Sequence, residues 1–256
     1  MRSLQPMLAP DDNSLSSVFP HGTAILGYPA GAMPRESKQA RGLRAKRILN
    51  ALFEAHPDAH CALHYTSPYE LLCATLLSAQ CTDKVVNTVT PALFKRFPDV
   101  GRLAQARPSE LERIIRSTGF YKNKTKNLIG MARAVRDKHG GHMPKTMEEL
   151  VELPGVGRKT ANVMLGNAFG TPGLVVDTHV ARLSNRMGLT RESDPVRIER
   201  DLTQLIPEEH WTQFSHAMIF HGRRICSARN PSCESCPVFC DCPFPRQSSR
   251  RAGRKP

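Results

Sequence analysis

Apolar side chains recur at helical spacing from about residue 40 onward, beginning with Leu43, Ile48 and Leu52. A second stripe at positions i, i+3, i+4 and i+7 consists of Tyr69, Leu72, Cys73 and Leu76. No stretch alternates apolar and polar residues for long enough to form a β-sheet. The pattern therefore predicts an all-α fold with short connections.

Local signals indicate where several helices start and stop. The sequences SPYE at residues 67–70 and TMEE at residues 146–149 are typical of capping boxes, and Pro68 fits a first helical position. Pro108 is expected to begin another helix, and Gly119 is expected to end it in a left-handed conformation.

Composition excludes several classes of protein. Residues 1–38 are rich in Pro, Gly and Ser and lack periodicity, which predicts a disordered leader. The 256 residues suffice for one or two domains, and no uninterrupted apolar run approaches the ~18 residues of a membrane span. The N-terminus carries Asp11 and Asp12 and lacks a compact apolar region, so it fits neither a secretory signal nor a transit peptide. A membrane protein is excluded, and the eight cysteines are too few for a disulfide-built secreted scaffold.

The formal net charge of +13 is concentrated in two places. Residues 101–140 carry ten basic and three acidic residues, and the tail at residues 245–256 carries five basic residues and no acidic one. A charge run is often only a solvated face, but a basic stretch interleaved with apolar positions favours a phosphate-facing surface. The charge therefore predicts an anionic partner, with nucleic acid the simplest choice.

The octet LPGVGRKT at residues 153–160 lies between two short helices. Two glycines around one apolar residue allow a sharp turn and a close approach of backbone N–H groups to a partner. The amides at the start of the next helix form a natural seat for a phosphate. The whole octet is typical of the helix-hairpin-helix motif of sequence-independent DNA binding. Its candidate DNA-binding residues are Gly155, Val156, Gly157, Arg158 and Thr160.

Two residues near this turn are candidates for catalysis. Lys159 lies in the first turn of the second helix, where partial burial and the helix N-terminus would both favour a neutral, nucleophilic amine. Its position alone is equally compatible with simple neutralisation of a phosphate. Asp177 lies between an apolar run and a helical one, which predicts an N-cap. A capping aspartate at the wall of a cleft can also hold a carboxylate near a developing positive charge.

Four cysteines at Cys226-x6-Cys233-x2-Cys236-x5-Cys242 lie within seventeen residues. Four thiolates suit Zn²⁺ or a [4Fe–4S] cluster, and the wide gaps fit paired zinc ligands poorly. Cys240 competes with Cys242 as a fourth ligand on spacing alone.

Together, LPGVGRKTANVML, the VDTHV segment that contains Asp177, HGRRIC and the cysteine spacing resemble endonuclease III. This is the iron–sulfur DNA glycosylase and abasic-site lyase family of the helix-hairpin-helix superfamily. The segments LLSAQCTD at residues 76–83 and GFYKNK at residues 119–124 match it as well. The resemblance covers residues 40–244 and implies a [4Fe–4S] cluster held by Cys226, Cys233, Cys236 and Cys242, with Cys240 left out.

The resemblance also implies two helical lobes with a DNA cleft between them. One lobe is a six-helix barrel and the other carries the cluster. The implied ranges are 61–171 for the barrel, with the hairpin motif at about 147–166, and 40–60 with 172–244 for the cluster lobe.

Roles for individual residues follow from the same resemblance. Lys159 would attack C1′ of a flipped nucleotide, and Asp177 would assist departure of the base. The resulting Schiff base permits β-elimination, which cleaves the strand 3′ to the lesion. Gln80 matches the residue that fills the gap left by the flipped nucleotide, and Phe120 matches an apolar wedge against the opposite strand.

The sequence departs from the family pattern in three places. The loop at residues 227–232 contains a single basic residue, Arg229, where the family has a more basic loop. Phe120 is bulkier than the expected aliphatic wedge, which puts the opposite-base preference in question. Cys81 places a thiol directly after Gln80.

The predicted function is removal of oxidised pyrimidines by a bifunctional glycosylase and abasic-site lyase. The expected partner is double-stranded DNA that contains damaged pyrimidines or abasic sites, and the expected form is a monomer in the bacterial cytoplasm, associated with the nucleoid. One alternative is a monofunctional adenine-mismatch glycosylase, which lacks the nucleophilic lysine. Another is a non-catalytic iron–sulfur DNA-binding paralogue.

Overall fold

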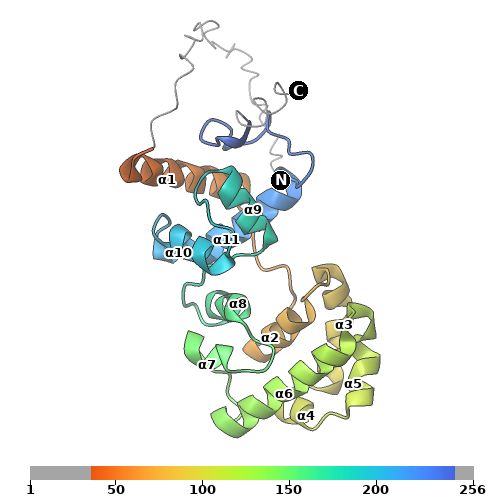
Figure 1. The fold of residues 1–256 in the computed structure, drawn as a ribbon. Helices are drawn as coiled ribbons and strands as arrows, with labels where there is room; N and C mark the ends of the chain where they lie inside the picture. Colours follow the sequence, from red (N-terminus) through yellow and green to blue (C-terminus); the bar gives the residue numbers. More distant parts are fainter. Residues whose placement is uncertain (1–35, 246–256) are drawn as a thin grey trace, which may run out of the picture. The chain divides into compact units, whose positions relative to one another are not determined.

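The computed structural model describes residues 36–245, and within that range all regular structure is helical (Figure 1). Eleven α-helices and two short 3₁₀ helices occur in this part of the chain, and the same range holds no β-strand. The expected all-α fold is confirmed. No helix in this range is long and apolar enough to cross a membrane.

The middle of the chain builds one hydrophobic core from Leu63 to Leu165. Its helices are α2 (Pro68–Leu77), α3 (Asp83–Arg96), α4 (Val100–Ala104), α5 (Pro108–Ile115), α6 (Tyr121–His139), α7 (Met147–Val151) and α8 (Arg158–Ala168), with η1 (Arg116–Thr118) after α5. Helix α2 contributes seven of its ten residues as buried side chains, so it is surrounded on all sides. Tyr69, Leu72, Cys73 and Leu76 all lie in this core, as their spacing predicts.

A second core joins the first helix to the C-terminal third of the described chain. Its helices are α1 (Lys38–Ala55), α9 (Thr178–Arg186), α10 (Pro195–Thr203) and α11 (Trp211–Arg224), with η2 (Glu208–His210) before α11. Helices α9 and α11 pack against each other, and α11 also contacts α1 and α8. Two segments far apart in sequence thus share one core.

The capping signals are confirmed, with differences in detail. Ser67 accepts a hydrogen bond from the Glu70 amide at 3.2 Å, as a capping residue should. The Glu70 carboxylate, however, accepts from the backbone and hydroxyl of Thr66 at 2.6 and 2.8 Å rather than from Ser67. Gly119 follows η1 and has the expected positive φ of +70°, but its ψ of 162° lies outside the left-handed helical region.

The first helix differs from its expected position. It begins at Lys38, where Ser37 accepts from the Ala40 amide, and it ends at Ala55. The last residues of the expected leader at 1–38 are therefore structured, and residues 1–35 lie outside the described range. Leu43 is 58 % exposed although its spacing places it on the apolar stripe. The basic residues of the tail, Arg246 to Lys255, also lie outside the described range.

Candidate active site

The hairpin between α7 and α8 is fixed by two buried side chains and one glycine. Leu153 and Val156 are buried in the first core, and the Val156 amide donates to the Leu153 carbonyl at 3.0 Å. Gly155 has φ +80°, and a Cβ there would lie 2.8 Å from the Asn127 side chain. Gly157 has open space around it and is the N-cap of α8. The turn therefore leaves the first amides of α8 exposed to a partner.

Arg158 and Lys159 follow each other at the start of α8 but have different surroundings. Arg158 forms a two-pronged ion pair with Glu199 of α10, with Nη2 2.8 Å from Oε1 and Nε 2.9 Å from Oε2. Lys159 is exposed and faces a pocket. The expected partial burial of Lys159 is wrong, and only its place at a helix N-terminus matches that expectation.

Asp177 caps α9 through one of its two carboxylate oxygens. Oδ1 accepts from the amides of His179 and Val180, both at 2.8 Å. The N-cap interpretation is confirmed. Because both hydrogen bonds go to Oδ1, the second oxygen is not used by the cap, and the side chain lines the same pocket as Lys159.

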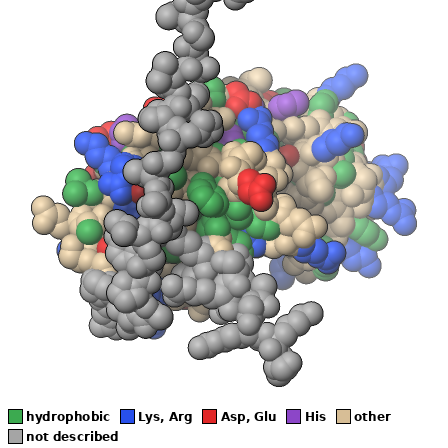
Figure 2. All heavy atoms as spheres, turned by 90° about the horizontal axis from the view of Figure 1, so that it is seen from above, with side chains coloured by type: hydrophobic (Ala, Val, Ile, Leu, Met, Phe, Trp, Pro, Cys, Tyr) green, Lys and Arg blue, Asp and Glu red, His purple; other side chains and the backbone are tan. Residues whose placement is uncertain are grey.

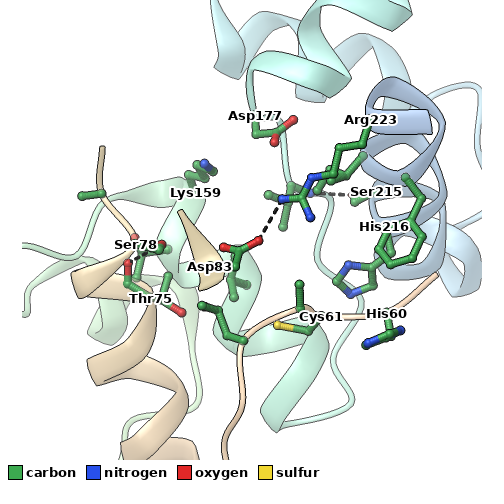
Figure 3. A pocket seen from close by; sticks show the side chains of 18 of the residues that line it. His60, Cys61, Thr75, Ser78, Asp83, Lys159, Asp177, Ser215, His216 and Arg223 are labelled. Carbon is green, nitrogen blue, oxygen red and sulfur yellow. Dashed lines mark hydrogen bonds and ion pairs between the residues drawn. The ribbon is translucent and has the colours of Figure 1, made fainter. Parts of the chain in front are cut away.

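This pocket has a volume of about 270 Å³ and takes side chains from both cores. Figure 3 shows Lys159 from α8 and Asp177 from the start of α9 on its walls. Gln80 and Thr160 line it as well. The fold thus brings together two candidate DNA-binding residues and two candidate catalytic residues that most of α8 and the loop after it separate along the chain.

An ion pair on the pocket wall was not anticipated from the sequence. The Asp83 carboxylate at the start of α3 accepts from Arg223 Nη2 near the end of α11 at 2.8 Å (Figure 3). Both residues belong to motifs already noted, LLSAQCTD and HGRRIC, which are the only sequence signal for them. The pair connects the first core to the second directly beside Lys159 and Asp177.

Two histidines complete the polar lining of this pocket. His216 lies against the Asn167 side chain, with Nε2 2.8 Å from Oδ1, and burial lowers the pKa of His216 to about 4. His60 lies nearby and packs its ring against Phe220 with centroids 5.6 Å apart. His216 is therefore a neutral hydrogen-bonding group at neutral pH rather than a cation.

Gln80 and Phe120 line a second hollow that adjoins the first. It also contains Asn127, Gly155 and Thr160, and its volume is about 230 Å³. Both Gln80 and Phe120 have a left-handed backbone, with φ +53° and +47°, which non-glycine residues rarely adopt. Phe120 is 64 % exposed. Two residues with a strained backbone therefore line one opening.

Two basic residues of the stretch at residues 101–140 bind backbone carbonyls at helix ends. Lys124 is buried and donates to the carbonyls of Leu77 and Thr118, both at 2.8 Å. Burial lowers the pKa of this lysine. Arg133 donates to the Ala104 carbonyl at 3.1 Å. Part of the charge therefore serves to satisfy carbonyls at helix ends, and a phosphate-facing role of the remaining basic residues stays a prediction.

The four candidate cysteine ligands lie in the segment after α11. Cys226, Cys236 and Cys242 pack against the second core, whereas Cys240 is exposed. All eight cysteines are free thiols, and no three His, Cys, Asp or Glu side chains in the described range are arranged to hold a single metal ion. The four thiols are nonetheless close enough to influence one another. Burial and then the charges of Cys236, Cys226 and Cys233 raise the pKa of Cys242 to about 11.

Arg186 organises this segment. Its guanidinium donates to Cys226 Sγ at 3.2 Å and to the carbonyls of Ser227 and Ala228 at 2.7 and 2.6 Å. Four cysteine sulfurs within one short segment are the donor set that a [4Fe–4S] cluster takes from a protein, and Arg186 donates to one of them. The donor set therefore fits an iron–sulfur cluster, with Cys240 left at the surface.

Comparisons with known proteins agree with this architecture. The model of the HhH-GPD superfamily of base excision DNA repair proteins matches residues 73–208. Endonuclease III of Synechocystis sp. is 52 % identical over 206 residues, which covers 80 % of this chain and 94 % of the relative.

Two solved structures are also similar. A non-covalent endonuclease III–DNA complex is 42 % identical with a TM-score of 0.78, covering 82 % of this chain and 98 % of the other. A trapped endonuclease III–DNA covalent intermediate has the same identity and TM-score, and covers 82 % and 99 %.

An all-helical fold with a hairpin beside a polar pocket defines a base excision DNA repair protein of the helix-hairpin-helix class. The chain belongs to the endonuclease III family. It is a DNA glycosylase and abasic-site lyase.

Proposed function

We propose that Lys159 and Asp177 carry out both reactions on a damaged nucleotide flipped into the pocket between the two cores. The neutral amine of Lys159 attacks C1′, and the bond from C1′ to the base breaks as the base departs with its electron pair and takes up a proton. The attacking nitrogen loses a proton, and the C1′–O4′ bond of the sugar ring breaks as O4′ takes up a proton, so that the C1′–nitrogen bond becomes a Schiff base. Loss of a C2′ proton and of the 3′ phosphate cleaves the strand 3′ to the lesion.

The observation that carries this proposal is that Lys159 and Asp177 line the same pocket. Lys159 is exposed to the pocket, and Asp177 keeps one oxygen outside its helix cap. A carboxylate there stabilises the positive charge that develops on the sugar. The rigid cap holds that carboxylate in place, so its orientation costs nothing during the reaction.

The substrate class follows from the partner and the pocket. The partner is double-stranded DNA, and the lesions are oxidised pyrimidines or abasic sites. Gln80 fills the space that the flipped nucleotide leaves, and Phe120 wedges against the opposite strand. Two observations support these roles: Gln80 and Phe120 line the same opening, and both have a left-handed backbone. Side chains that fill the stack offset the few kcal/mol that base extrusion costs.

The hairpin binds backbone phosphate close to the lesion. The free amides at the start of α8 are the donors, and Gly155, Val156, Gly157 and Thr160 shape the turn around them. Arg158 contributes less than a free arginine would, because Glu199 already neutralises it.

The four thiols Cys226, Cys233, Cys236 and Cys242 would hold the [4Fe–4S] cluster. Such a cluster, when bound, would join the four cysteines through one centre. It would thereby cross-link the segment after α11. We place the lobes at about 61–171 for a barrel and at 40–60 with 172–244 for a cluster lobe, and the two separate hydrophobic cores support this division. The enzyme acts as a monomer in the bacterial cytoplasm, associated with the nucleoid.

Borohydride trapping on abasic DNA tests the central step. The wild-type chain is expected to form a covalent adduct, and Lys159→Ala is expected to form none. Lys145→Ala is a matched control, because Lys145 is an exposed lysine that does not line the pocket. An undiminished adduct in Lys159→Ala contradicts the assignment of the nucleophile. No adduct with the wild type, together with base removal, favours the monofunctional alternative.

A further inference from the structure

Four arginines surround a hollow that shares no residue with the pocket of Lys159. We call it the arginine hollow; its volume is about 510 Å³. Its residues come from the end of α3, from α4 and the link that follows it, and from α5 (Figure 1). Its arginines are Arg96, Arg102, Arg107 and Arg113.

The charges in the arginine hollow are unbalanced. Glu110 is the sole carboxylate of the lining residues, and it is paired with Arg96. The hydrogen bond from Arg96, followed by the charges of Arg96, Arg113 and Arg107, lowers the pKa of Glu110. Within residues 36–245, no acidic side chain forms an ion pair with Arg102, Arg107 or Arg113. Three exposed guanidinium groups thus share one hollow whose single carboxylate is already paired with Arg96.

The arginine side chains of the hollow favour phosphate as the recognised group. Guanidinium forks match phosphate oxygens in pairs, which suits arginine better than lysine for this contact. Arg107 is the N-cap of the eight-residue helix α5 and makes no side-chain cap, and Ser109 of its first turn lines the hollow. The positive end of the α5 dipole adds to the attraction.

The hollow offers no exposed aromatic ring on which a base could stack. Its one aromatic ring, Phe97, is 3 % exposed, and the Arg96 guanidinium covers it at 5.4 Å from the ring centre. Contacts to phosphate are therefore the contacts that the arginine hollow favours. Recognition by charge without base contact is the mode by which proteins bind the DNA backbone independently of sequence.

Helix α5 connects the arginine hollow to the lesion-binding side. Its eight residues span about 12 Å at 1.5 Å per residue, from Pro108 beside the hollow to Ile115. The turn η1 then leads directly to Phe120 at the second opening. Figure 2 also shows Lys and Arg side chains toward the right-hand edge of its face, with few acidic ones among them.

We propose that the arginine hollow binds backbone phosphates of duplex DNA at a contact separate from the Lys159 pocket. This inference rests on the proposed function for the identity of the polyanion. The contact adds affinity for DNA that extends beyond the lesion, without reading its sequence and without taking part in the chemistry.

The test uses the full chain with Arg102, Arg107 and Arg113 all replaced by Gln. A charge-matched control replaces Lys38, Lys46 and Arg200 by Gln. These three residues are exposed and lie on α1 and α10, two helices that build the second core. The single variants Arg102→Gln and Arg113→Gln keep the test possible if the triple variant does not fold.

Binding is measured to duplexes of increasing length that carry a central tetrahydrofuran abasic analogue. This analogue cannot form a Schiff base, so the result does not depend on Lys159 as the nucleophile. For long duplexes, the triple variant is expected to bind at least about tenfold more weakly, and its salt slope is expected to fall by about two to three. Each single variant is expected to lower the slope by about one. The shortest duplexes and the control variant should show little change.

Equal salt slopes for wild type and triple variant at every length overturn the proposal. So does a loss of binding to polyglutamate with DNA binding unchanged, which would assign the hollow to an acidic protein segment. Thermal protection by inorganic phosphate that the triple variant lacks, again with DNA binding unchanged, would assign it to a free anion.

Discussion

Asp177 serves two purposes because a carboxylate has two oxygens. Oδ1 accepts both cap hydrogen bonds, and Oδ2 is left for the pocket. The hydrogen bonds that cap α9 therefore also hold the Asp177 carboxylate at the pocket. Stability and catalysis can be separated at this residue, because asparagine preserves the cap and removes the charge.

Asp177→Asn and Asp177→Ala are therefore expected to differ. Both variants should lose most of the single-turnover rate of base removal, since neither holds a negative charge. Only Asp177→Ala should lower the free energy of unfolding, by about 1 kcal/mol, because alanine cannot cap α9. Urea denaturation and single-turnover kinetics measure the two effects. Equal stability of the two variants would contradict the dual role.

Lys124 is a basic residue that is buried and hydrogen-bonded to backbone carbonyls. The carbonyls of Leu77 and Thr118 lie at the ends of α2 and η1, where helical partners are lacking. The Lys124 ammonium group donates to both. A basic residue that a charge count assigns to DNA is in this case part of the core.

At the scale of elements, the hairpin depends on one glycine more than on the other. Gly155 combines a positive φ with close contact to Asn127, whereas Gly157 has neither. The spacing G-x-G indicates that both positions are small, but it does not distinguish their reasons. The distinction arises from the packing of α6 beside the hairpin.

Gly155→Ala is expected to lower the free energy of unfolding by about 1–2 kcal/mol, the cost of a left-handed backbone for alanine. Contact with Asn127 should add to this loss. Gly42→Ala is the matched control, because Gly42 lies inside α1 with open space around it. That substitution should raise the free energy of unfolding by roughly 0.5–1 kcal/mol. Denaturation of both variants checks the opposite signs.

In the molecule as a whole, the segment with the four thiols makes polar contacts with α1 and α9, two helices of the second core that lie far apart in the sequence. Arg44 of α1 donates to the carbonyls of Met187 and Asp241 at 2.6 and 3.1 Å, and Arg47 pairs with Asp241 at 2.7 Å. Arg186 of α9 holds Cys226 and the residues that follow it. The segment has few buried apolar residues of its own, so these polar contacts help to position it.

Cys226→Ser and Cys240→Ser test which thiols hold the cluster. Cys226→Ser is expected to lose iron and visible absorption and to unfold at a lower temperature, since a ligand is missing. Cys240→Ser should keep all three properties, because Cys240 is exposed and lies outside the second core. Iron content, the visible spectrum and thermal unfolding are the measurements. Loss of iron in Cys240→Ser alone would reverse the assignment of the fourth ligand.

The sequence by itself determined the local features of this protein. Helix starts at Pro68 and Pro108, the hairpin at residues 153–160 and the cap at Asp177 all depend on neighbouring residues, and the structure has each of them. Local hydrogen bonds and backbone preferences decide such features, so a short stretch of sequence is enough to predict them.

Only the tertiary structure decided which distant residues meet and which charges reach solvent. It placed the Asp83–Arg223 pair beside Lys159, neutralised Arg158 with Glu199 and buried Lys124. It also divided the basic stretch between helix-end contacts and the arginine hollow. These outcomes depend on how helices pack, and packing sums contacts between residues that no local pattern connects.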